Sequence, residues 1–142
     1  MDWTNPNNVN VNEPFIYIIR IDAGGKEYRY IGKASKKSRL NAYNNNLKRI
    51  YLGLPKRNIP KDKPRREGNI KYRYVHLILA VAERQGWTID HYPIENVPKI
   101  QLKTREQTLI REHDANLNSK RSWYVENLET LEAEFLNQTG ET

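Results

Sequence analysis

The fold is decided by the stretch Phe15-Ile16-Tyr17-Ile18-Ile19-Arg20-Ile21, which a Gly24-Gly25 pair separates from Glu27-Tyr28-Arg29-Tyr30-Ile31. The first run is β-branched, aromatic and almost continuously apolar, which is typical of a strand covered on both faces of its sheet. The second run alternates between apolar and polar residues, and the glycine pair favours a two-residue hairpin turn. We therefore predict an antiparallel hairpin whose first strand is central in the sheet.

A two-residue turn also determines which residues of the hairpin face each other. Counting back from Gly24 and Gly25 pairs Ile19 with Tyr30, and Tyr17 with Gly32. Diagonal neighbours in such a pair lie about 7–8 Å apart at the backbone. We therefore expect Tyr17 and Tyr30 to share one face, although tyrosines on a strand are more often core aromatics than functional residues.

The remaining periodicity predicts helices and one further strand. Apolar residues recur at helical spacing from Ser38 onward, and residues 71–85 form a strong helix candidate that ends at Gly86. Residues 87–92 alternate like a strand that ends before Pro93. The pattern Thr104-x-x-Gln107 is that of a capping box, which predicts a helix start, and an acidic helix is expected over about residues 123–137.

Composition narrows the class of protein. The 142 residues carry 24 Lys and Arg against 17 Asp and Glu, and this formal net charge of +7 favours a polyanionic partner such as nucleic acid. The absence of cysteine excludes disulfides, iron–sulfur clusters and cysteine-based zinc sites. No signal peptide is evident, and the longest apolar run, Tyr74–Ala82, is too short to span a bilayer. We therefore expect one cytoplasmic domain over residues 1–142 that does not enter a membrane.

Positive charge is concentrated between Lys48 and Arg73. This segment holds ten basic residues against two acidic ones, and its net charge of +8 exceeds that of the whole chain. It includes a Pro- and Gly-rich stretch over about residues 52–70, and loops of this length are often functional. We interpret the stretch as a basic insertion that binds DNA phosphates, with a merely solvated loop as the alternative. The candidate DNA-binding residues are Lys56, Arg57, Lys61, Lys63, Arg65, Arg66, Lys71 and Arg73.

Two tyrosine motifs and a glutamate motif carry a family resemblance. Phe15-Ile16-Tyr17 and Tyr30-Ile31-Gly32 lie on the two strands of the hairpin, and Arg39 follows at the start of a helix. The segment Glu106-Gln107-Thr108-Leu109-Ile110-Arg111-Glu112-His113 lies on a later helix and is followed by Asn118. In this order, across a motif core of residues 15–118, the motifs resemble the GIY-YIG nuclease superfamily of restriction, homing, phage and excision-repair endonucleases.

The resemblance implies both a fold and a set of site residues. The fold would be α+β, with a small three-stranded antiparallel sheet flanked by helices, which agrees with the element order read from periodicity. The strands would be Phe15–Ile21, Glu27–Ile31 and Trp87–Tyr92. The residues implied to be catalytic are Tyr17, Tyr30, Lys33, Arg39, Tyr43, Glu106 and Asn118, with Glu106 as the metal ligand.

The chemistry of these residues fits phosphodiester hydrolysis. A single reliable carboxylate, Glu106, implies one Mg²⁺ or Mn²⁺ ion with mostly water as its other ligands. Arg39 can donate two parallel hydrogen bonds to phosphate oxygens. We expect Tyr17 to take the proton from water, because Gly32 opposite it leaves room for phosphate and water to approach. A phenol has an ordinary pKa of about 10, so Lys33, Arg39 or the metal must lower that of Tyr17.

The sequence therefore predicts a divalent-metal-dependent DNA endonuclease of the restriction or of the phage and mobile-element type, and a homodimer on DNA is one arrangement it allows. Two alternatives stay open: a structure-selective DNA repair nuclease, and a catalytically inactive nucleic-acid-binding module. The histidines His76, His91 and His113 lie far apart and form no metal-binding motif. We interpret His76 as a core histidine within an apolar helix.

Overall fold

The computed structural model describes residues 1–57, 70–118 and 122–139. At its centre is an antiparallel sheet of three strands, β1 (Phe15–Ala23), β2 (Lys26–Ala34) and β3 (Thr88–Asn96). The strands lie in the order β2-β1-β3, so β1 is the central strand. This confirms the predicted α+β class, the three-stranded sheet and the central position of the first strand.

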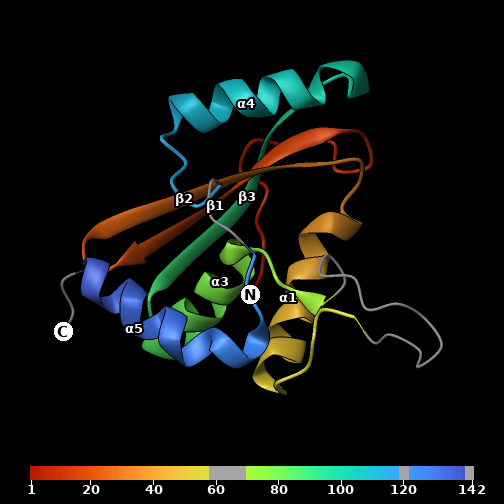
Figure 1. Ribbon diagram of the computed structural model, residues 1–142. Coiled ribbons are helices and arrows are strands. Elements are labelled where there is room, and N and C mark those ends of the chain that lie inside the picture. Colours follow the sequence, from red (N-terminus) through yellow and green to blue (C-terminus); the bar gives the residue numbers. More distant parts are fainter. Residues whose placement is uncertain (58–69, 119–121, 140–142) are drawn as a thin grey trace.

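Helices cover both faces of the sheet (Figure 1). On one side lie α1 (Ser38–Tyr51), α3 (Tyr74–Gln85) and α5 (Leu128–Thr139), the last preceded by the short helix η2 (Val125–Asn127). On the other side lies α4 (Leu102–Glu112), preceded by η1 (Lys99–Gln101). Within the described parts of the chain, no helix has the length and apolar character needed to cross a membrane.

Alternation along β1 divides its side chains between two cores. Phe15, Tyr17 and Ile19 pack toward α1, α3 and α5, whereas Ile16 and Ile18 pack toward α4. Each of these five side chains is at most 2% exposed. Burial on both faces explains why the run is almost continuously apolar instead of alternating.

The hairpin has the predicted register. Gly24 and Gly25 adopt φ angles of 64° and 97°, which a two-residue turn of this kind requires and which glycine adopts readily. Tyr17 is paired with Gly32 and Ile19 with Tyr30. The rings of Tyr17 and Tyr30 are 6.4 Å apart between centroids, so the two tyrosines share a face.

Both edge strands of the sheet form hydrogen bonds with residues outside the sheet. At β3, the Thr4 amide donates to the His91 carbonyl at 3.0 Å. At β2, the Leu117 amide donates to the Arg29 carbonyl at 3.0 Å, and the Asn116 side-chain oxygen accepts from the Arg29 amide at 3.0 Å. Residues far apart in the chain therefore extend the hydrogen bonding of both edge strands.

The third strand is longer than predicted. Instead of ending before Pro93, β3 continues to Asn96, with a shift of register opposite Ile16 and Tyr17. Because β3 is an edge strand, a proline that lacks an N–H group can be accommodated there.

Two predicted helix starts were wrong. The capping box at Thr104 and Gln107 is not formed: α4 begins at Leu102, and its N-cap, Gln101, makes no side-chain hydrogen bond. The turn of η1 already brings the chain into helical conformation before Thr104. Helix α3 begins at Tyr74 instead of residue 71, because the Tyr72 backbone is paired with Trp123.

Candidate functional site

A pocket of about 390 Å³ lies at the β2 edge of the sheet, where the two helical layers approach each other. Tyr30 contributes from β2, Arg73 from the residue before α3, and Glu106 from α4 on the opposite face. Asn118 lies on the segment that follows the edge of β2. At an edge strand, side chains from both faces of the sheet can reach a common space.

Glu106 is a half-buried carboxylate with few partners. Its side chain is 19% exposed, and Lys33 Nζ lies 3.9 Å from its Oε1. Burial raises the pKa of Glu106, while the charges of Lys33 and Arg73 act in the opposite direction. Among the described residues no hydrogen bond to the carboxylate is present beyond this ion pair, so its oxygens keep acceptor capacity for a ligand.

The surroundings of Glu106 determine what kind of metal they fit. The described residues contain no group of three or more His, Cys, Asp or Glu side chains that would enclose a metal ion. Magnesium usually keeps several water ligands and needs only one or two carboxylates from the protein. A single carboxylate with free acceptor capacity on a pocket fits Mg²⁺ or Mn²⁺ held largely by water.

Of the two motif tyrosines, Tyr30 is the one that lines this pocket. Its side chain is 6% exposed, and its hydroxyl oxygen accepts a hydrogen bond from Arg73 Nη1 at 3.1 Å. The same pocket wall therefore presents a phenol, a guanidinium and, from Glu106, a carboxylate.

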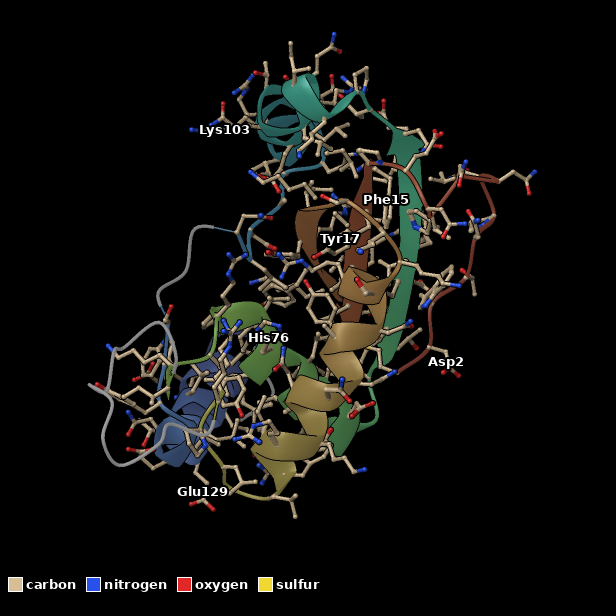
Figure 2. All side chains as sticks on the ribbon, turned by 90° about the vertical axis from the view of Figure 1, so that its right-hand side faces the viewer. Asp2, Phe15, Tyr17, His76, Lys103 and Glu129 are labelled. Atoms are coloured by element: carbon tan, nitrogen blue, oxygen red, sulfur yellow. The ribbon has the colours of Figure 1, made fainter. Side chains whose placement is uncertain are left out.

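Tyr17 lies behind Tyr30, inside the larger core. Its hydroxyl is 2.6 Å from that of Tyr43, and its side chain is 2% exposed. Figure 2 shows Tyr17 between the sheet and the helices, in the layer that also holds His76. Burial, together with the neighbouring Tyr30, raises the pKa of Tyr17 far above its ordinary value, whereas Arg39 acts to lower it. The positive charge of Arg39 therefore does not produce the expected lowering of the Tyr17 pKa, because burial outweighs it.

The space opposite Tyr17 also differs from the prediction. A Cβ atom added to Gly32 would lie 2.2 Å from Tyr17 Cζ and 2.4 Å from the Tyr17 oxygen. The room that the glycine leaves is thus filled by the Tyr17 ring and does not admit phosphate or water. Gly32 is required for packing, and the predicted reason for choosing Tyr17 as the base is removed.

Asn118 is committed to the backbone of β2. Its side-chain oxygen accepts from the Ile31 amide at 2.8 Å, and its side-chain nitrogen donates to the Ile31 carbonyl at 2.7 Å. Ile31 lies between Tyr30 and Gly32, so Asn118 holds the strand that presents Tyr30. The geometry gives this asparagine a positioning role.

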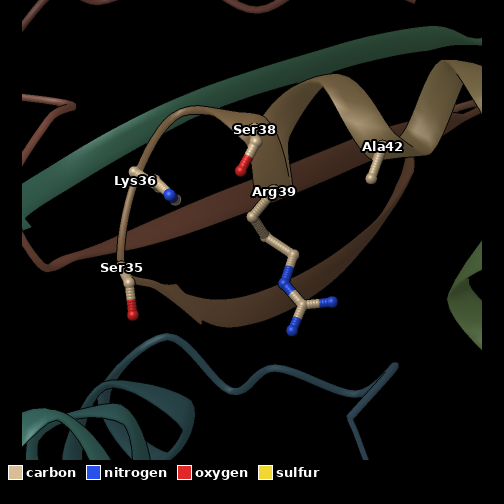
Figure 3. A pocket seen from close by; sticks show the side chains of 5 residues that line it. All are labelled: Ser35, Lys36, Ser38, Arg39 and Ala42. Carbon is tan, nitrogen blue, oxygen red and sulfur yellow. The ribbon is translucent and has the colours of Figure 1, made fainter.

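Arg39 lies in a separate hollow of about 330 Å³ at the start of α1, with Ser35, Lys36 and Ser38. Figure 3 shows its side chain extending away from the first turn of the helix, with the guanidinium at the far end. Among the described residues the guanidinium has no hydrogen bond or ion pair. Its charge acts to lower the pKa of Tyr17 and of Tyr43, although burial of both phenols dominates.

The described ends of the basic insertion lie beside this site. The Lys56 amide donates to the Ile70 carbonyl at 3.4 Å, which brings the two ends together. Burial lowers the pKa of Lys56, and the positive charges of Arg73, Arg57 and Arg39 lower it further. The charges of three other predicted DNA-binding or catalytic cations therefore act on Lys56.

Of the other predicted DNA-binding residues, only Lys71 is among the described residues. Lys71 Nζ lies 4.7 Å from the centre of the Tyr124 ring. Four members of the predicted set lie outside the described residues: Lys61, Lys63, Arg65 and Arg66.

Sequence reasoning did not place the buried histidines beside the tyrosines. His91 lies 5.5 Å from Tyr17 and 5.3 Å from Tyr43 between ring centroids, and His76 lies 4.9 Å from Tyr43. The Nε2 atom of His76 contacts the Asn46 side chain at 3.1 Å, whereas its Nδ1 atom has no partner among the described residues. His91 could have been found from the strand register, since it is paired with Ile19 on β1.

The chain matches no family model, no curated protein and no solved structure.

Proposed function

We propose that the protein is a divalent-metal-dependent DNA endonuclease that hydrolyses phosphodiester bonds. The observation that carries the proposal is the pocket shared by Tyr30, Arg73 and Glu106. Hydrolysis needs a group that takes a proton from water, positive charge at the phosphate and stabilisation of the leaving oxygen. Three segments distant in sequence bring a phenol, a guanidinium and a metal-binding carboxylate to one place.

Glu106 would hold the Mg²⁺ or Mn²⁺ ion. When bound, such an ion supplies positive charge to the phosphate and to the leaving oxygen. Burial raises the pKa of Glu106, and the charge of Lys33, whose Nζ lies 3.9 Å from Oε1, acts to lower it.

Tyr30 is the better candidate for the general base. Tyr30 lines the pocket and its hydroxyl contacts Arg73, whereas the Tyr17 hydroxyl is buried and paired with Tyr43. In the proposed step Tyr30, as the phenolate, takes a proton from water, and the water oxygen forms a bond to phosphorus. The bond from phosphorus to the 3′ oxygen breaks, and that oxygen takes a proton from solvent. The products are a 3′ hydroxyl and a 5′ phosphate.

The neighbouring cations support DNA as the substrate. The charges of Arg73, Arg57 and Arg39 all act on Lys56, so Arg73 of the pocket belongs to a larger positively charged region. Such a cluster attracts the phosphates on either side of the cleaved bond. More specifically, we propose an enzyme of the restriction type or of the phage and mobile-element type. It would act in the cytoplasm and as a homodimer on DNA.

Incubation of the purified protein with supercoiled plasmid in Mg²⁺, and in parallel with EDTA, tests the proposal. We expect linear or discretely cut DNA in Mg²⁺ alone. Nicks confined to branched or damaged substrates would instead indicate the repair nuclease. A salt-sensitive gel shift without cleavage, in Mg²⁺ and in Mn²⁺, would contradict the enzyme and indicate a binding module.

A further inference from the structure

Arg73 is held in place on both sides. It is the N-cap residue of α3, with an extended backbone of φ −64° and ψ 151°. Immediately before it, Tyr72 is fully buried, exchanges two 2.8 Å backbone hydrogen bonds with Trp123, and donates its hydroxyl to the Leu54 carbonyl at 2.9 Å. Immediately after it, Tyr74 and Val75 enter the core. The backbone therefore presents the Arg73 side chain from a defined position, as a preorganised site requires.

The Arg73 guanidinium has donors left for a ligand. A guanidinium carries five N–H donors in a fixed planar fork, and one of them is used by Tyr30 at 3.1 Å. Arg73 is exposed, and no carboxylate within the described parts of the chain forms an ion pair with it. Within the described residues it is thus a cation without an ion-pair partner, on the wall of the pocket that Glu106 also lines.

Arg73 and Arg39 occupy different places. The hollow at Arg39 shares no lining residue with the pocket at Glu106. The cations whose charge acts on the Glu106 carboxylate are Lys33 and Arg73, and Arg39 is not among them. The arginine beside the carboxylate is therefore the one that precedes α3, and not the one implied by the resemblance.

We propose that Arg73 is a catalytic residue of the nuclease: its guanidinium binds the phosphate that is cleaved and stabilises negative charge on the Tyr30 oxygen. This inference rests on the proposed function and deepens it. During attack, negative charge accumulates on the non-bridging phosphate oxygens, and a planar fork can donate two hydrogen bonds to them. The donor that already contacts Tyr30 stabilises the phenolate that takes the proton from water. One side chain thus links the base to the phosphate.

The test compares Arg73 with an arginine on the same helix. Arg84 lies in the last turn of α3 and pairs with Glu132, with Nε 3.6 Å from Oε2. Single-turnover cleavage of a duplex substrate at saturating enzyme would be measured for Arg73→Ala, Arg73→Lys, Arg84→Ala and wild type, and DNA affinity would be measured in EDTA. We expect Arg73→Ala to lose about 10²–10³-fold in rate, as for removal of one preorganised donor. Arg73→Lys should lie in between, and Arg84→Ala should match wild type.

Two further measurements separate a catalytic role from a structural one. Added guanidinium ion should restore part of the rate of Arg73→Ala, because it replaces the missing group. The rising limb of the pH–rate profile of Arg73→Ala should move to higher pH, because the phenolate has lost its cation. If Arg73→Ala fails to fold, as judged by circular dichroism, Arg73→Gln replaces it in every comparison.

The possible outcomes distinguish a failure of this inference from a failure of the proposed nuclease function. If wild type does not cut any DNA substrate, the proposed function is wrong, and the inference fails with it. If wild type cuts and the folded Arg73 variant cuts equally fast at saturation, with an unchanged pH profile, the inference alone is overturned. Weaker DNA binding with an unchanged saturating rate would also overturn it, since Arg73 would then be an ordinary phosphate contact.

Discussion

At the scale of single residues, the two motif tyrosines are chemically alike but differ in their surroundings. Tyr30 faces the pocket and accepts a hydrogen bond from a cation, whereas Tyr17 is buried against Tyr43 and Gly32. A phenol that acts as a base must reach water and must have its charged form stabilised. These differences lead to separate predictions for the two side chains.

Removing the Tyr30 hydroxyl should slow cleavage more than removing that of Tyr17. Loss of a general base costs about 10²–10⁴ in rate, so Tyr30→Phe should fall within that range. Tyr17→Phe removes one buried hydrogen bond and should cost about 1 kcal/mol in the free energy of unfolding, with a smaller loss of rate. Single-turnover rates from pH 6 to 9.5 and urea unfolding check both. If the rising limb of the pH–rate profile disappeared in Tyr17→Phe but persisted in Tyr30→Phe, Tyr17 and not Tyr30 would be the general base.

Gly32 should be required for stability and not for substrate access. In Gly32→Ala the new methyl group meets the Tyr17 ring at 2.2 Å, so the ring must move within a packed core. Overpacking of this kind costs about 1–3 kcal/mol. Urea unfolding of Gly32→Ala measures the cost, and the same substitution in a Tyr17→Leu background is the control, where the cost should shrink. An equal cost in both backgrounds would show that the tyrosine ring is not its cause.

Single residues also show where sequence reasoning succeeds and where it stops. Pairing of Tyr17 with Gly32 followed from the turn length alone, because register in a hairpin is a local property. Burial of the Tyr17 hydroxyl and the contact of Arg73 with Tyr30 depend on α1 and α3, which are distant in sequence. The sequence therefore identified the candidate residues, but it could not show that the Tyr17 hydroxyl is buried against Tyr43 while Tyr30 contacts Arg73.

At the scale of elements, side-chain periodicity predicted the strands and helices, whereas their ends depended on contacts between segments. β3 passes through Pro93 because it lies at an edge, and α3 starts late because Tyr72 pairs with Trp123. A local sequence pattern reveals neither the edge position of β3 nor the pairing of Tyr72 with Trp123. The packing of α3 and β3 against the tyrosines also buries His76 and His91, which gives the fold a pH dependence.

The buried histidines should destabilise the protein in acid. Burial, with positive charge at Lys56, Arg73 and Arg39, lowers the pKa of His76 to about 3, and burial with the amino terminus lowers that of His91 to about 4. The ordinary pKa is about 6.5, so below this pH the unfolded chain binds protons that the folded chain does not. Stability should be highest above about pH 6.5 and fall as the pH drops toward 4, by about 1–2 kcal/mol per histidine between pH 7 and 5.

Urea unfolding at pH 7 and pH 5 measures this loss for wild type, His76→Leu and His91→Leu. The difference between the two pH values cancels the packing effect of each substitution, so each variant should show a smaller loss than wild type. An undiminished loss in both variants would mean that other groups cause the acid sensitivity.

At the scale of the whole molecule, charge is distributed around one site. The charges of Arg39 on α1, Arg57 on the insertion and Arg73 before α3 all act on Lys56, and Arg73 also lines the pocket at the β2 edge. The sequence shows which segment of the chain carries the excess positive charge. It could not predict that Arg73 lies beside Glu106, because this proximity depends on how the helices are arranged around the sheet. A DNA backbone crossing the pocket would meet several of these cations together.

Substituting Lys56 and Arg57 by serine should weaken binding to all DNA sequences alike. Each lost phosphate contact removes about 0.9 from the slope of log affinity against log salt, so the double variant should lose up to about 1.8. Affinity for two unrelated duplexes in EDTA, measured over a range of salt concentrations, checks this. The matched control is Lys99→Ser/Lys103→Ser, on the side of the molecule that α4 covers. A slope unchanged from wild type would place the two cations away from the DNA.

The central claim is that Glu106 is the metal-binding carboxylate of a nuclease, and one comparison tests it most directly. Cleavage of plasmid in Mg²⁺ would be measured for wild type, for Glu106→Gln and for Glu112→Gln, an exposed glutamate on the same helix. Glu106→Gln keeps the volume of the side chain and removes the ionised ligand, so it should lose at least about 10²-fold in rate while retaining DNA binding in EDTA. Glu112→Gln should cut as wild type does. Cleavage by Glu106→Gln at the wild-type rate would contradict the account.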